Sequence, residues 1–201
     1  MRGVTRHAFS GEAITPKGTK DHEGNVHMTE TARIADQLRR AFDGKAWHGD
    51  SLLEILAGVT AAQAAARPIA RAHTIWELVL HIAAWDGAVR RRMTGVAAKL
   101  SAAKNFPPVT DTSEAAWAKT LEHVRRVHGE LIDAVEKFPE KSLNKQVPGK
   151  KGAHYDFYYM LHGVVQHELY HAGQIALLKK CRRTLCGAGE VPILTSQKTR
   201  R

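Results

Sequence analysis

The chain has 201 residues, of which 43% are hydrophobic, and a formal net charge of +10 at pH 7. This length suits a single domain with its own hydrophobic core. The sequence contains no run of 18 apolar residues, which argues against a transmembrane helix, and its first 28 residues carry no apolar stretch of signal-peptide length. We therefore expect a cytoplasmic protein without a membrane partner.

The positive charge is concentrated at the C-terminal end. Residues 179–201 hold seven Lys or Arg and one Glu. A basic tail of this kind attracts polyanions without selecting among them, and no groove-reading helix or set of stacking aromatic residues accompanies it. We expect no specific nucleic-acid partner. The basic cluster Arg90-Arg91-Arg92 is predicted to form the solvated end of a helix.

The N-terminal part is predicted to be an extension followed by helices. Residues 1–28 show no periodicity and are predicted to be disordered. Apolar residues then recur at every fourth position, which predicts a first long helix over residues 29–42. Two short helical segments follow, at residues 51–56 and 60–66.

Capping boxes predict where the next two long helices begin. Thr74 and Glu77 form such a box, and the helix that they begin is predicted to end near residue 93. Residues 101–110 are predicted to be a loop. Asp111 and Glu114 form a second box, which predicts a third long helix that ends near residue 138.

The last long helix is predicted to follow a Gly- and Lys-rich loop, with Asp156 as its cap. No segment shows the alternation typical of strands. The sequence therefore predicts an all-α domain at residues 29–180, a four-helix bundle with one or two short extra helices, followed by a basic tail at residues 181–201.

Three histidines are predicted to lie on buried helix faces. His167 and His171 are four residues apart, so they share one face of the last helix, one turn apart. His81 lies on the apolar side of the helix that begins at Thr74. The last helix carries apolar residues on the same face: Met160, Val164, Ile175 and Leu178. Unpaired imidazoles are costly to bury, so the three histidines are predicted to be the ligands of one metal ion.

The segment from His167 to His171 also fits H-E-x-x-H, the motif of many zinc metallopeptidases. The extended motif requires Gly three residues after the second His, but Gly173 stands two residues after it. Leu177 occupies the position of the third His. No strand-rich region precedes the motif. The peptidase is the weaker interpretation.

The chain resembles the DinB/YfiT-like family of bacterial metal-dependent enzymes, which are small helical bundles. Two segments carry the resemblance: LHIAAWD at residues 80–86 and HELYHAGQI at residues 167–175. The family pattern places one metal ligand on the second long helix and an H-x-x-x-H pair on the last one. The resemblance therefore implies His81, His167 and His171 as ligands.

Characterised relatives include metal-dependent transferases and isomerases that use low-molecular-weight thiols such as bacillithiol or mycothiol. The resemblance thus implies a thiol S-transferase that acts on a small-molecule substrate. Three imidazoles leave an open position on a divalent ion such as zinc or nickel. A hydrolase that uses metal-bound hydroxide and a non-enzymatic metal-binding stress-response module remain open as alternatives, and so does a homodimer.

Supporting residues carry weaker signals. Gln174 lies one turn from His171, where it could orient a ligand or simply be a polar residue at the bundle end. Glu168 could act as a base, but a solvated face or a salt bridge on the helix is favoured. His48 could line the mouth of a pocket or supply a fourth ligand, but packing within its turn is favoured. His162 is predicted to point away from the ligand pair.

Overall fold

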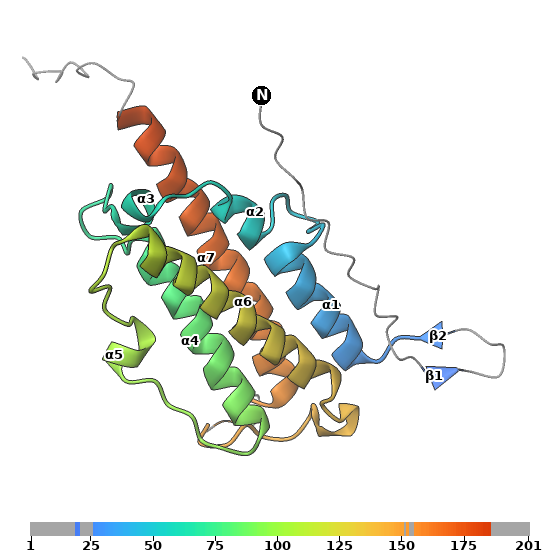
Figure 1. Cartoon of the computed structure of the whole chain (residues 1–201). Helices are drawn as coiled ribbons and strands as arrows, with labels where there is room; N and C mark the ends of the chain where they lie inside the picture. Colours follow the sequence, from blue (N-terminus) through green and yellow to red (C-terminus); the bar gives the residue numbers. More distant parts are fainter. Residues whose placement is uncertain (1–18, 21–25, 151, 153–154, 186–201) are drawn as a thin grey trace, which may run out of the picture.

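The computed structural model describes residues 19–20, 26–150, 152 and 155–185, and it confirms the all-α four-helix bundle (Figure 1). The four long helices are α1 (Glu30–Asp43), α4 (Ile75–Met93), α6 (Glu114–Glu136) and α7 (Phe157–Leu185). α4 packs against α6 and α7, and α1 packs against the same two helices. Within the described ranges, no helix is both long and apolar enough to cross a membrane.

Short elements connect the long helices. Two of them, α2 (Leu52–Leu56) and α3 (Ala61–Ala65), lie between α1 and α4 along the chain. The segment predicted to be a loop at residues 101–110 contains one helical turn, α5 (Ala102–Asn105), which packs beside α4. A 3-10 turn, η1 (Glu140–Ser142), follows α6.

Two short strands lie within the part of the N-terminal extension that the structure describes. β1 (Thr19–Lys20) and β2 (Val26–His27) form a two-stranded antiparallel sheet in which Thr19 pairs with His27. The backbone ladder satisfies its own hydrogen bonds, so these residues need no hydrophobic periodicity to pair. Most of residues 1–28 lie outside the described residues.

Side-chain caps define most of the helix starts. The capping box of Thr74 and Glu77 is present at the start of α4. The box predicted for α6 is wrong, because Ser113 is the N-cap and its hydroxyl accepts a hydrogen bond from the Ala116 N–H at 3.2 Å. Asp111 instead accepts the Ser113 N–H, and Glu114 accepts the Ala61 N–H at 3.0 Å. Glu114 therefore ties the start of α3 to α6.

The last helix begins where the sequence predicts and extends beyond the predicted bundle domain. Asp156 Oδ1 accepts the Tyr159 N–H at 2.8 Å, so Asp156 caps α7. The helix continues to Leu185, past residue 180, where the sequence places the end of the bundle domain. Residues 186–201, which make up most of the predicted basic tail, lie outside the described residues.

The buried interior consists of two apolar clusters with a polar layer between them. One cluster is formed by α2, α3, the N-terminal parts of α4 and α6 and the C-terminal part of α7. The other is formed by α1, the C-terminal parts of α4 and α6 and the N-terminal part of α7. Asp86 on α4, His128 on α6 and Glu168 on α7 lie between the two clusters along these helices, and each of their side chains is 1% exposed. We call these three residues the polar layer.

Candidate metal centre

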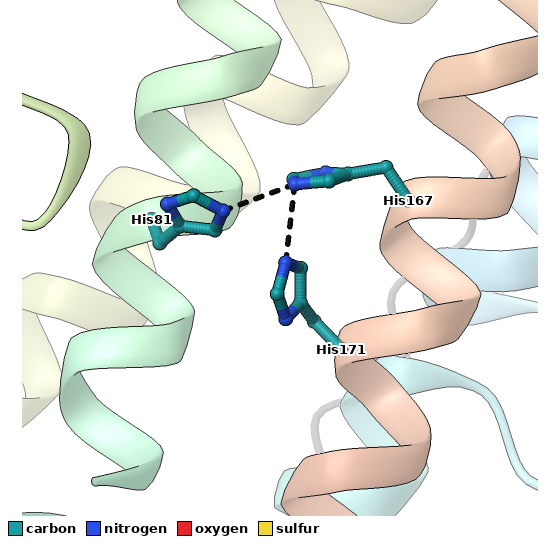
Figure 2. Close-up of side chains that lie close together, drawn as sticks. All are labelled: His81, His167 and His171. Carbon is teal, nitrogen blue, oxygen red and sulfur yellow. Dashed lines mark hydrogen bonds between the residues drawn. The ribbon is translucent and has the colours of Figure 1, made fainter. Parts of the chain in front are cut away.

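The three histidines meet between α4 and α7. Figure 2 shows His81 reaching from α4 towards His167 and His171 on α7. The Nε2 atom of His167 lies 3.0 Å from that of His81 and 3.1 Å from that of His171. One ligand nitrogen from each of the three residues lies within 4.8 Å of the others. Zinc–nitrogen bonds of about 2.0–2.1 Å place tetrahedral ligand nitrogens about 3.3 Å apart, so the spacing suits a metal ion.

Hydrogen bonds on the far side of two rings fix which nitrogen carries the proton. His81 Nδ1 lies 2.8 Å from the carbonyl oxygen of Asn105, which only accepts, so Nδ1 donates. His171 Nδ1 likewise donates to Gln174 Oε1 at 2.7 Å. In a neutral imidazole the other nitrogen then holds a lone pair. Both Nε2 lone pairs therefore point towards His167.

Direct hydrogen bonding cannot satisfy this arrangement by itself. A neutral His167 carries at most one hydrogen on Nε2 and can donate it to only one of the two neighbouring lone pairs. The Nε2 lone pair of the other neighbour then receives no hydrogen, although it lies about 3 Å from His167 Nε2. A cation bound to all three nitrogens removes this conflict, so the donor set fits a metal ion.

The electrostatic environment keeps the three rings neutral at pH 7. Burial, together with the smaller effect of the neighbouring His171 and His81, lowers the pKa of His167 to about 4. Burial also lowers the pKa of His81 and of His171, although the hydrogen bonds to Asn105 and Gln174 act in the opposite direction. Neutral imidazole is the form that binds metal, so the site needs no deprotonation before it can take an ion.

Residues after α4 hold His81 in place, and sequence reasoning missed them. The ring of Phe106 stacks on His81 with centroids 4.1 Å apart. Besides its carbonyl contact with His81, Asn105 accepts the Trp85 Nε1–H on its side-chain oxygen at 2.8 Å. The only signal in the sequence is an Asn and a Phe before two prolines, and no spacing relates them to His81.

A cavity of about 720 Å³ adjoins the histidine cluster. It lies between the C-terminal half of α4 and the N-terminal half of α7, and Trp85 and His167 form part of its wall. Its aromatic side chains also include Tyr155, Tyr158 and Tyr170. Small-molecule sites typically have volumes of about 300–1,000 Å³. The cluster is therefore next to a space that can hold a small molecule.

The other polar residues that were candidates for the site differ in their distance from the histidine cluster. Gln174 contacts His171, as the orienting role requires. His48 is exposed and belongs neither to the histidine cluster nor to the cavity wall, so neither the pocket-mouth position nor the turn packing is observed. His162 also lines the cavity, but its Nε2 pairs with Glu30 at 3.2 Å.

Glu168 is buried inside the bundle, so the prediction that it lies on a solvated face is wrong. Its carboxylate is buried in the polar layer, 3.9 Å from His128 Nδ1, and neither oxygen has a hydrogen-bond partner. Burial and the nearby Asp86 raise the pKa of Glu168, to about 8, against the opposing effect of His128. α7 packs against α1, α2 and α4, and more than one of its faces is therefore buried. Glu168 is not placed to act as a base at the cavity.

Asp86 and His128 complete the polar layer, and the sequence analysis assigned a role to neither. His128 Nδ1 lies 2.9 Å from Asp86 Oδ2, and His128 Nε2 donates to the carbonyl oxygen of Leu38 at 3.3 Å. Burial alone would lower the pKa of His128, but the hydrogen bond to Asp86 and the nearby Glu168 together raise it. Burial raises the pKa of Asp86. This network joins α1, α4, α6 and α7.

Comparison with known proteins agrees with this architecture. The sequence model of the DinB superfamily matches residues 46–175. The chain belongs to the DinB superfamily. The matched range of this DinB-superfamily chain includes His81, His167 and His171, and also the three residues of the polar layer. No curated protein and no solved structure gives a significant match.

Proposed function

We propose that this DinB-superfamily chain is a metal-dependent enzyme that binds one zinc or nickel ion through His81, His167 and His171. Its reaction is the transfer of a low-molecular-weight thiol to a small electrophilic substrate. The observation that carries the proposal is the convergence of three imidazoles beside a cavity of about 720 Å³. The resemblance to thiol-using DinB/YfiT-like enzymes supports the choice of a thiol.

The residues around the cluster have separable roles in this reaction. Asn105 and Gln174 hold two of the rings with their Nε2 lone pairs directed inwards. A divalent ion held there supplies a Lewis acid that favours the deprotonated form of a thiol. Trp85 and the tyrosines of the cavity wall form an apolar surface against which the electrophile can lie.

The transfer is balanced as a substitution. The thiol loses its proton to solvent, its sulfur forms a bond to the electrophilic carbon, and the leaving group departs with the electron pair of the broken bond. His167 belongs both to the cluster and to the cavity wall, so we place the reacting sulfur on that side of the cluster.

The alternatives differ in what they require of the site. A metallopeptidase of the H-E-x-x-H type needs Glu168 beside the ion as a base, whereas Glu168 is buried in the polar layer. A hydrolase that uses metal-bound hydroxide needs no such base and is tested by the same assay. A purely structural ion needs no adjoining cavity.

The test is an S-conjugation assay with the full chain loaded with zinc or nickel. Cysteine, glutathione, bacillithiol and mycothiol serve as thiols, and 1-chloro-2,4-dinitrobenzene serves as the electrophile. We expect metal-dependent conjugation with at least one thiol, its loss in His167→Ala and its retention in His123→Ala, which removes an exposed histidine of α6. Equal rates in His167→Ala and the parent chain contradict the proposal. Metal-dependent ester hydrolysis without thiol consumption favours the hydrolase.

A further inference from the structure

Arg92 is a buried cation that the proposed reaction does not use. The sequence analysis placed it in a solvated cluster, but it is 3% exposed. Its Nε and Nη2 atoms both donate to the carbonyl oxygen of Ala98, at 3.0 and 2.8 Å. Nη1 is closed to solvent and has no hydrogen-bond partner. An ionised group in this position is costly unless something compensates its charge.

The described residues supply little compensation for this charge. Arg90, two residues earlier on α4, pairs with Glu130 at 3.1 Å. Arg92 forms no ion pair within the part of the chain that the structure describes. The Arg92 guanidinium carbon lies 5.3 Å from the ring centroid of Trp85, which provides a cation–π contact. Neither a carbonyl oxygen nor an aromatic face neutralises a full positive charge.

Arg92 also forms part of the wall of the cavity that reaches the histidine cluster. The residues that line the cavity include no Asp or Glu among those described. The Trp85 ring, which contacts Arg92, also contacts His167, with the two ring centroids 5.6 Å apart. One cavity therefore combines an uncompensated cation, aromatic surfaces and one of the candidate metal ligands.

We propose that the cavity binds a small organic carboxylate with an aromatic or apolar body. Arg92 holds the carboxylate, and the body lies along Trp85 and the tyrosines towards His167. The donors on Nη1 are the free ones, so the guanidinium turns towards the cavity when the ligand enters. A carboxylate matches one positive charge, whereas a phosphate monoester carries about two negative charges at pH 7. As an assignment of the substrate or thiol cosubstrate, this inference rests on the proposed function, but the binding itself does not need the metal.

The test compares two ligands of the same shape and different charge. The full chain, stripped of metal with a chelator, is titrated by calorimetry with 3-phenylpropionate and with 3-phenylpropionamide. We expect the acid to bind at least about tenfold more tightly than the amide, because a hydrogen bond to a charged partner is stronger than one to a neutral group. Equal affinities, or no binding of the acid at millimolar concentration, overturn the inference.

Variants of two arginines on the same turn of α4 show which residue causes the preference for the acid over the amide. Arg92→Gln is expected to bind acid and amide equally, whereas Arg91→Gln removes an exposed charge and is expected to keep the preference. Arg92→Lys keeps the charge and is expected to retain part of the preference. Since the acid–amide comparison needs no variant, the inference can be tested even if Arg92→Gln does not fold. A preference that persists in a folded Arg92→Gln overturns it.

The metal-loaded chain separates this inference from the proposed function. If the acid is preferred only after zinc is added, and Arg92→Gln keeps that preference, the carboxylate binds the ion and the role of Arg92 is wrong. If the metal-free chain prefers the acid but the histidine cluster binds no metal, the cavity inference stands and the proposed function fails.

Discussion

The histidine cluster and the polar layer share helices α4 and α7, yet the two groups differ in how their buried polar atoms are compensated. His81 and Asp86 lie on α4, and His167 and Glu168 are consecutive residues of α7. The polar layer is closed, and in it His128 is hydrogen-bonded to the Asp86 carboxylate and lies 3.9 Å from that of Glu168. The histidine cluster adjoins a cavity and contains only imidazoles, so its lone pairs have no positive partner among the described residues.

This difference indicates what each group contributes. A closed network that compensates its own charges joins helices and needs no ligand. A cluster whose acceptors face one another beside a cavity is incomplete without an ion. The two neighbouring residues His167 and Glu168 therefore contribute to a candidate site and to the scaffold, respectively.

The largest effect on stability is expected from opening the polar layer. Asp86→Ala leaves His128 buried without its hydrogen-bonded carboxylate, and removal of one partner from a buried pair costs about 3–5 kcal/mol. Urea denaturation of the metal-free chain measures the change. Asp133→Ala, which removes an exposed carboxylate from α6, serves as the control. A loss no larger than that of the control would show that the layer does not join the helices.

The histidine cluster and the polar layer should change the free energy of unfolding in opposite directions as pH rises. His167 has its pKa lowered from 6.5 to about 4, so its contribution is present above pH 6.5 and is lost as pH falls through about 4. Glu168 has its pKa raised from 4.5 to about 8, so its contribution is present below pH 4.5 and is lost as pH rises through about 8.

Glu168→Gln removes the loss of stability expected at alkaline pH, because the amide does not ionise. The metal-free variant is expected to be more stable than the parent chain at pH 9 and to keep the loss of stability on the acidic side. Denaturation midpoints across the pH range provide the measurement. A variant that is less stable than the parent chain at pH 9 would contradict the raised pKa of Glu168.

The smallest effect is expected from the hydrogen bond behind His171. Gln174→Ala removes the acceptor that holds the ring, and loss of such a supporting partner typically lowers metal affinity about 10–100-fold. Competition with a chromogenic zinc chelator measures the change, and Gln37→Ala, which alters an exposed residue of α1, is the control. Unchanged zinc affinity would show that Gln174 does not orient the ligand.

The sequence predicts best what local rules determine. The long helices follow from apolar periodicity, and Asp156 caps α7 because its side chain reaches an N–H three residues ahead. His81, His167 and His171 come together as expected, because two share a helix face and the third lies on an apolar face. Ser113 replaces Asp111 as a cap because both residues suit the role and the sequence does not choose between them.

The remaining features depend on packing among several helices. Glu168 and Arg92 carry charges and are predicted to be exposed, but both are buried where additional faces of α7 and α4 are covered. His128 and Asp86 are 42 residues apart, so no spacing rule could pair them. Asn105 reaches His81 from a segment that packs beside α4. Such contacts are set by tertiary structure, which single-sequence patterns do not encode.

The most direct test of the three-histidine metal centre is the metal content of the full chain, purified without a histidine tag and compared with His167→Ala and His123→Ala. We predict close to one zinc or nickel ion per chain in the parent and in His123→Ala, and almost none in His167→Ala. An absence of metal from all three proteins, even after zinc or nickel is added, would contradict the account and leave a helical bundle that buries three neutral histidines.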